Sequence, residues 1–283
     1  MNAKSIALSI TIVLVTSVTA FATPPGGKAG DAIEQMMRQS SYTTQNRAML
    51  MAKTREAFKY GMSPDDVAAM VRKGIAGPTD ARTLGRYLAL CIEAEQQGLP
   101  VQPVLNKILQ GMAKGVPSER IITVAVKVKR TMEAAAGIVE SAEQRGLQGS
   151  TSKERKKAIE TISFALETGL PAGELSALSH KAIDKDLPFA RFTRVVESMA
   201  NLKAAGMPGD LVVRTARQFI ILRYSEAGIA RTEQELMRMK KDHMSWDRAF
   251  RRMQAGFGES SGGMDGGFRH SPGSGGGHGK GGK

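Results

Sequence analysis

A cluster of cationic side chains is the part of this sequence whose residue types and spacing most clearly suggest chemistry. Residues 107–130 carry six Lys and Arg side chains against a single carboxylate, that of Glu119. In a helix, the spacing of Arg120, Lys127 and Arg130 places them along one side. Such a side binds anions, or it is simply the solvated face of a basic protein. The candidate anion-binding residues are Lys107, Lys114, Arg120, Lys127 and Arg130.

Soft and titratable groups that could serve catalysis or metal binding are few. His243 lies near Met237, Met239 and Met244 in the sequence, and imidazole with thioethers suits Cu(I). The sixteen Met residues are scattered mostly at apolar helical positions, however, where Met is a ready core filler. The chain contains no nucleophile elbow, His-Glu-x-x-His motif or phosphate loop. We therefore assign no catalytic residue, no cofactor and no metal ligand, and expect a protein that is not an enzyme.

The positive charge belongs to the body of the chain rather than to its ends. The formal net charge is +13, and residues 256–283 contribute three basic against two acidic side chains. Nucleic acid is the usual partner of a strongly basic domain, but no basic motif interleaved with aromatic residues is present. We therefore expect a protein or a polyanionic cell-envelope component as partner. Peripheral contact with a membrane also fits, and nucleic acid is disfavoured.

An internal repeat predicts the elements that position these residues. Gly98-Leu99-Pro100 recurs 71 residues later as Gly169-Leu170-Pro171, and the same shift aligns Val116-Pro117 with Leu187-Pro188. A Gly just past a helix closes its C-terminus in the left-handed conformation, and Pro suits the first turn of the next helix. The phrase therefore predicts tight α-hairpins in copies of about 36 residues.

Apolar positions recur in register with these turns, which predicts one apolar face on each helix. The longer helix has three corresponding sets: Leu84, Ile121 and Phe192; Tyr87, Val124 and Val195; Leu88, Ala125 and Val196. The shorter helix has one such set: Val67, Val104, Leu175 and Val212. Cys91 corresponds to Val128, Ile162 and Met199 in other copies. We therefore expect Cys91 to be a buried core residue rather than a reactive thiol.

These patterns predict an all-α protein of tandem α-hairpin repeats. The hairpins form either a solenoid-like array or a compact helical bundle. The predicted parts of the body are an N-terminal segment with helices over 23–60, a first repeat lobe over 61–145 and a second repeat lobe over 146–230.

The third copy is the least regular, because it lacks a turn glycine at the expected place near Ala134. Residues 117–145 can instead run as one long helix through Gly137, since no Pro interrupts them. The next helix then begins at a cap formed by Thr151 or Ser152 and supported by Glu154.

Residues 1–22 have the pattern of a secretory signal peptide. Lys4 supplies a basic start, residues 6–18 are apolar, and Ala20-Phe21-Ala22 is a small-x-small cleavage site before Thr23. An uncleaved N-terminal anchor is the alternative. The rest of the chain has no apolar run long enough to span a membrane. We expect an exported protein, periplasmic or else extracellular.

The C-terminal part of the chain differs from the repeats. An amphipathic helix is predicted over 231–255, followed by a disordered Gly-rich tail over 256–283. The helix carries a narrow apolar seam, which covers the open end of the array or docks a partner. The seam consists of Leu236, Met239, His243, Trp246, Phe250 and Met253.

The stretch 98–121, which contains the Gly-Leu-Pro and Ala-Lys-Gly-Val-Pro-Ser-Glu-Arg-Ile phrases, resembles a segment of exported bacterial helical-repeat proteins of unassigned function. It covers under a tenth of the chain and implies no catalytic residue. Tetratricopeptide repeats have nearly the same period, but their Trp, Gly-Tyr and Ala-Phe signature is missing.

Together these features predict a non-enzymatic, exported binding or structural module. It presents a basic helical-repeat surface to an anionic envelope component or protein partner. The alternative function is a periplasmic helical bundle that senses or carries a ligand or metal.

Overall fold

The computed structural model describes residues 27–147 and 151–259. Within these ranges the chain forms helices and turns and no strands, which confirms the all-α hairpin-repeat fold. The helices are α1 (Gly27–Gln39), α2 (Thr44–Lys59), α3 (Pro64–Ala76), α4 (Ala81–Gln96), α5 (Gln102–Ala113), α6 (Ser118–Gln144), α7 (Ser152–Glu167), α8 (Ala172–Asp184), α9 (Phe189–Ala204), α10 (Gly209–Ile221), α11 (Glu226–Lys241) and α12 (Trp246–Glu259).

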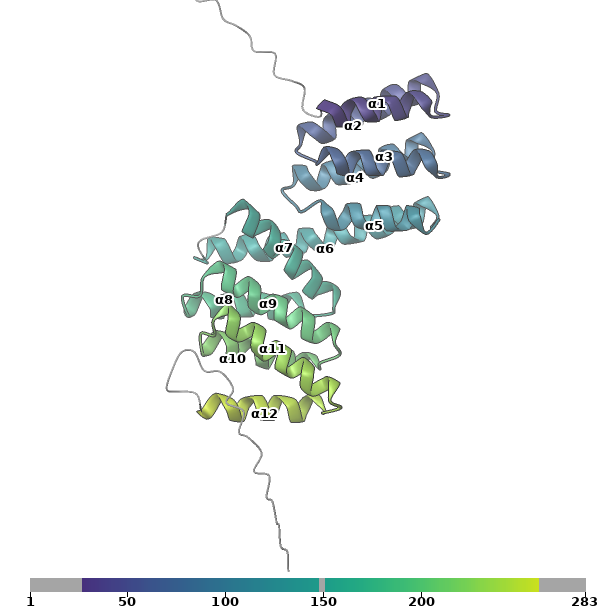
Figure 1. The fold of residues 1–283 in the computed structure, drawn as a ribbon. Coiled ribbons are helices and arrows are strands. Elements are labelled where there is room, and N and C mark those ends of the chain that lie inside the picture. The colour runs from purple at the N-terminus through teal and green to yellow at the C-terminus, as the bar shows by residue number, and fades with distance from the viewer. Residues whose placement is uncertain (1–26, 148–150, 260–283) are drawn as a thin grey trace, which may run out of the picture.

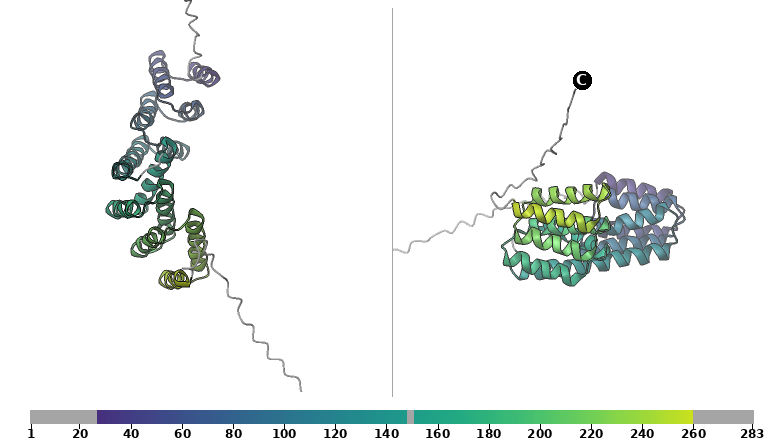
Figure 2. Two further views of the ribbon diagram at one scale, coloured as in Figure 1. Left: turned by 90° about the vertical axis from the view of Figure 1, so that its left-hand side faces the viewer. Right: turned by 90° about the horizontal axis from the view of Figure 1, so that it is seen from below.

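The helices form two double-layered stacks that are displaced sideways from each other (Figure 1). In the first stack, α1, α3 and α5 follow one another in one layer, and α2, α4 and the first part of α6 follow in the other. In the second stack, α7, α9 and α11 form one layer, and the later part of α6 with α8, α10 and α12 forms the other. The array is open and elongated, with α1 and α12 at opposite ends (Figure 2).

The hairpin turns share one hydrogen-bond geometry, in which the apolar residue after the turn bonds back into the preceding helix. The N–H of Leu99 donates to the carbonyl oxygen of Ala94 at 2.9 Å, and that of Leu170 donates to Ala165 at 3.1 Å. The preceding residue is left-handed, with φ 68° at Gly98. Because these bonds satisfy carbonyls that the helix end leaves free, the Gly-apolar-Pro phrase stops one helix and starts the next.

The same geometry makes the prediction of a single helix over 231–255 wrong. α11 ends at Lys241, and the N–H of Met244 donates to the carbonyl oxygen of Met239 at 3.0 Å. His243 takes the left-handed position with φ 62°, although it is not a glycine. The last helix, α12, then continues to Glu259, past the predicted start of the tail. The rest of that tail and the predicted signal peptide lie outside the described residues.

The prediction of one long helix through Gly137 is confirmed by α6. The cap predicted for the next helix is also present: the N–H of Glu154 donates to the Thr151 hydroxyl at 3.2 Å, and the N–H of Thr151 donates to the Glu154 carboxylate at 2.8 Å. This reciprocal pair satisfies two donors at the start of α7. α6 and α7 thus meet inside the second stack, while α6 itself belongs to both stacks.

Glycine permits close packing of α5 on α6. A Cβ atom added at Gly111 would lie 2.6 Å from Cγ1 of Ile121, which is too close for a carbon contact. The corresponding Gly74 has the same relation to Leu84, at 2.9 Å. Gly137, on the exposed side of α6, has no neighbour within 4 Å of such an atom.

We therefore expect opposite effects from two Gly-to-Ala substitutions. Gly111→Ala should lower the free energy of unfolding by about 1–3 kcal/mol, because it pushes α5 away from Ile121. Gly137→Ala should raise it by about 0.5–1 kcal/mol, because Ala loses less backbone entropy in a helix. Urea denaturation followed by circular dichroism measures both. Stabilisation by both substitutions would contradict the close packing of α5 on α6.

Candidate anion-binding surface

All five candidate anion-binding residues are exposed on the last hairpin of the first stack. Lys107 lies on α5, Lys114 lies in the turn after it, and Arg120, Lys127 and Arg130 lie on the first part of α6. Within the part of the chain that the structure describes, none of the five forms an ion pair. Their charges are therefore available to an external anion.

Lys129, in the same stretch, has a different environment. Its side chain is only 12% exposed, and its Nζ lies 3.2 Å from a carboxylate oxygen of Glu93 on α4 and 3.2 Å from one of Glu133 on α6. Nζ also donates to the side-chain oxygen of Gln97 at 3.2 Å. Because two carboxylates neutralise its charge, one on α4 and one on α6, Lys129 links these helices and is not one of the candidate anion-binding residues.

The repeat shows why this surface is unusual. Val124 was predicted to share a buried stripe with Tyr87 and Val195, which are both 0% exposed, but Val124 is 41% exposed. The prediction that Val124 is buried is therefore wrong. Lys107, one turn back from Gly111 on α5, shows the same contrast: Met70 and Leu178, at the corresponding positions, are buried.

The reason is the sideways displacement of the second stack. The main contacts of α5 are with α3, α4 and α6, and none of the described helices continues the first stack beyond it. The helices that follow α6 pack on its later part, where Arg155 of α7 pairs with Glu143 at 3.2 Å. The end face of the first stack is therefore left open, and we name it the α6 ledge. The α6 ledge consists of Lys107, Arg120, Val124, Lys127 and Arg130.

The charge on the α6 ledge has one sign. Glu119 is the acidic residue of this region, and its carboxylate already pairs with Arg86 of α4 at 2.7 Å. Exposed Lys and Arg side chains retain long-range attraction for anions, which salt screens over about 10 Å at 0.1 M. The arrangement can therefore concentrate an anionic partner, and it offers no acid–base pair for catalysis.

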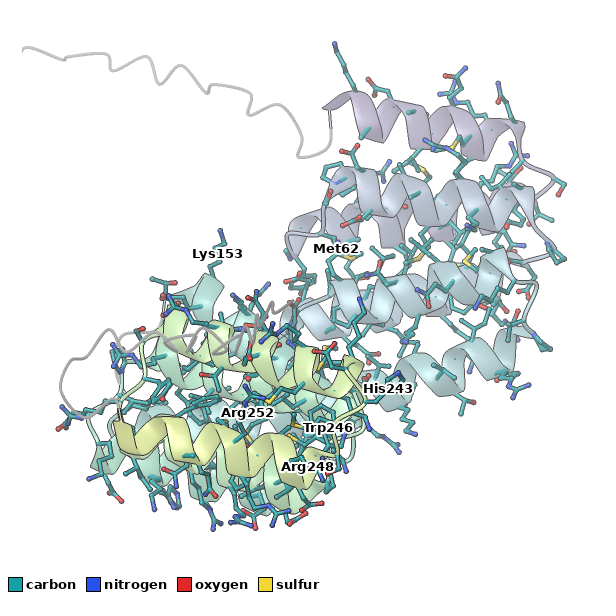
Figure 3. All side chains as sticks on the ribbon, turned by 60° about the horizontal axis from the view of Figure 1, so that its bottom comes forward. Met62, Lys153, His243, Trp246, Arg248 and Arg252 are labelled. Atoms are coloured by element: carbon teal, nitrogen blue, oxygen red, sulfur yellow. The ribbon has the colours of Figure 1, made fainter. Side chains whose placement is uncertain are left out.

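The predicted docking seam at the C-terminus is filled by the chain itself. Trp246, Phe250 and Met253 are buried together with Leu236 and Met239, where α12 packs against α10 and α11. This burial agrees with the capping alternative and contradicts a seam that is open to a partner. His243 does not belong to the seam, because it lies exposed in the turn before α12 (Figure 3).

Two cations cover the aromatic residues of this cap. The guanidinium carbon of Arg214 lies 4.8 Å from the ring centroid of Phe250, and Nζ of Lys240 lies 5.7 Å from that of Trp246. The outer side of α12 instead shows exposed basic residues, of which Arg248 and Arg252 appear in Figure 3. The end of the second stack is therefore closed by a helix with a polar outer surface, as a terminal repeat requires.

Cys91 is fully buried, as predicted. Burial raises the pKa of its thiol from 9.0 to about 12. The thiol is therefore protonated and enclosed at neutral pH, and it acts as a small apolar core residue.

Metal and small-molecule sites have little support in the described residues. They contain no group of three His, Cys, Asp or Glu side chains that could hold a metal ion. An open depression of about 490 Å³ lies between α8 and α10, where Lys181, Asp184 and Arg217 form part of its wall. It carries both signs of charge, because Asp184 lines it together with Lys181 and Arg217. Arg217 is in addition already paired with Glu174 at 3.1 Å. None of the described helices has the length and apolarity needed to cross a membrane.

The fold defines the class of protein: an open α-hairpin repeat array with two stacks joined by a shared helix. Comparisons with family models, curated proteins and solved structures find no match to this chain. The sequence predicted the four cations of the α6 ledge but missed the exposure of Val124 and the end of the first stack, although Lys107 stands where other copies carry the buried Met70 and Leu178. That substitution pattern is the feature that could have revealed where the first stack ends.

Phe250→Ala should destabilise the C-terminal end of the array by about 3–5 kcal/mol, because it removes a buried ring from the cap. Trp246 is the only Trp in the chain, so its fluorescence during urea denaturation reports directly on this end. Arg252→Ala, on the exposed side of the same helix, is the control and should leave the midpoint unchanged. A Phe250→Ala midpoint equal to that of the control would contradict the cap.

The thiol of Cys91 should make stability fall as the pH rises from 9 toward 12, because the unfolded thiol loses its proton in this range and the folded one keeps it. The expected contribution is a loss of about 1.4 kcal/mol per pH unit. Cys91→Val introduces the side chain that Val128 has at the corresponding repeat position. It should remove this loss of unfolding free energy at alkaline pH. Urea midpoints of both proteins at several alkaline pH values test this, and identical slopes would contradict it.

Proposed function

We propose that this protein is a non-enzymatic, exported binding module whose α6 ledge holds an anionic component of the cell envelope or an acidic protein. One observation carries the proposal: on this face, Lys107 replaces Met70 and Leu178, which the corresponding copies bury, and no carboxylate in the described chain neutralises Lys107 or Lys127. A stack end that served only solubility would need charged residues of either sign, whereas the charged residues of the α6 ledge are all cations.

Electrostatic attraction is the driving force that this surface supplies. The net charge of +13 draws anions toward the array from a distance, and the α6 ledge provides the place where several cations act together. Binding of this kind is fast to form and weakens as salt screens the charges.

Export is the second part of the proposal. It rests on the pattern of residues 1–22, namely the basic Lys4, the short apolar stretch and the small residues Ala20 and Ala22 before Thr23. An extracytoplasmic location places the basic array among anionic polymers, acidic lipid headgroups and envelope proteins.

Reversal of charge on the α6 ledge should weaken the binding of poly-L-glutamate. Lys107→Glu, Lys127→Glu and Arg130→Glu together should reduce the affinity at least about tenfold at 0.1 M salt, since three attractions become repulsions. The control variant carries Arg248→Glu, Arg251→Glu and Arg252→Glu on α12 and changes the net charge by the same amount. Fluorescence anisotropy across a salt series measures both. An equal loss in the two variants, or binding indifferent to salt, would show that the α6 ledge is not the site.

The mature protein should begin at Thr23. N-terminal sequencing of protein recovered from the envelope fraction of expressing bacteria checks this directly. Ala20→Leu with Ala22→Leu should leave the precursor uncut, because the cleavage site accepts small residues. Recovery of an intact N-terminus from the unmodified chain would favour the anchor instead.

A further inference from the structure

We infer that the α6 ledge is the docking site for an acidic amphipathic helix of another protein. The inference rests on the proposed function and narrows the partner from any anion to a helix with a defined surface. It follows from the helices that pack against the corresponding faces of α4 and α9.

The positions of the α6 ledge are helix-binding positions elsewhere in the molecule. On α4, the corresponding face packs against α6, and Arg86 pairs with Glu119 across the contact at 2.7 Å. On α9, it packs against α11, and Arg194 pairs with Glu233 at 2.8 Å. Arg86 and Arg194 occupy the same place in their repeats, one residue before the buried Tyr87 and Val195. The face that carries Val124 therefore has the form that receives a helix.

The chemistry of the α6 ledge selects an acidic helix. Arg120 and Lys127 lie four residues before and three residues after Val124, so they flank it on the same side of α6. Arg130 stands where α9 has Asn201, whose amide donates to Glu233 of the covering helix at 2.8 Å. A matching helix thus presents one apolar side chain to Val124, with carboxylates about one turn away on each side.

A second copy of this chain does not meet that requirement. The outer face of α12, at one end of the array, exposes Arg248, Arg251 and Arg252. Contact between that face and the α6 ledge would bring cations against cations, which opposes association. The net charge of +13 also opposes self-association, so the inferred partner is a different chain with a negatively charged helix.

A designed peptide provides the probe. It has the sequence of residues 225–241, the segment that covers α9, with Arg231→Glu, Arg238→Glu, Lys240→Glu and Lys241→Glu. Titration of the labelled peptide with the full-length protein, followed by anisotropy, should show saturable binding that weakens with salt. Val124→Gln, which keeps every charge, should weaken the peptide about fivefold by removing the apolar contact. Ile221→Gln, at an equally exposed residue outside the α6 ledge, is the control and should have no effect.

The two substitutions separate this inference from the proposed function. Val124→Gln should leave the binding of poly-L-glutamate unchanged, whereas the triple charge reversal should weaken both ligands. If Val124→Gln leaves the peptide affinity unchanged while the charge reversal still weakens poly-L-glutamate, helix docking is wrong and only the proposed function holds. Tighter binding to phosphatidylglycerol vesicles than to the peptide, insensitive to residue 124, would overturn helix docking in favour of a lipid surface.

A footprint gives an independent readout. Val124→Cys introduces a thiol on the α6 ledge, and the native Cys91 does not compete for a thiol reagent because it is enclosed in the core. Saturating peptide should slow the labelling of residue 124 at least about fivefold, because a packed helix excludes the reagent. Labelling at an unchanged rate would contradict docking at this face.

Discussion

The whole structure depends on the fact that an α-hairpin cannot bury its own apolar face. Each pair of antiparallel helices exposes a stripe that only the next pair can cover, so stability comes from the contacts between successive hairpins. The Tyr87 face of α4 is covered by α6 and the Val195 face of α9 by α11, and an Arg at the same repeat position crosses each contact to a Glu. Tight turns keep the hairpins antiparallel, and close approaches such as that of Gly111 to Ile121 bring the helices together.

The long α6 changes this regular succession. Because it continues through Gly137 without a turn, its later part starts a second stack that is displaced sideways instead of continuing directly below the first. One ion pair joins the two stacks, that of Lys156 of α7 with Glu95 of α4, while Lys129 and Glu93 hold α6 on α4 within the first stack. The same displacement leaves the side of early α6 that carries Val124 uncovered by any of the described helices. The α6 ledge is thus a direct consequence of one missing turn.

Open ends of repeat arrays must be protected, and this molecule does so in two ways. At the end of the second stack, α12 buries Trp246 and Phe250 and turns its Arg residues outward. At the end of the first stack none of the described helices is added; Lys107 replaces the apolar Met70 and Leu178 of other copies, and Val124 stays partly exposed. The cap formed by α12 closes the end of the second stack, whereas the α6 ledge leaves open a surface that still has the form of a helix contact. This difference supports a binding role for the α6 ledge more strongly than net charge alone.

Local patterns in the sequence determined the helices, most of the turns and the core. The Gly-apolar-Pro phrase, the cap at Thr151 and the burial of Cys91 each depend on a few neighbouring residues or on repeat positions, so all three were predictable. The turn at His243 was missed because its left-handed residue is neither Gly nor followed by Pro. The exposure of Val124 was missed for a different reason: burial depends on what lies against a helix, not on its own periodicity. Only the tertiary structure decided which apolar faces find a neighbour, because the displacement of two stacks is a long-range consequence of the length of α6.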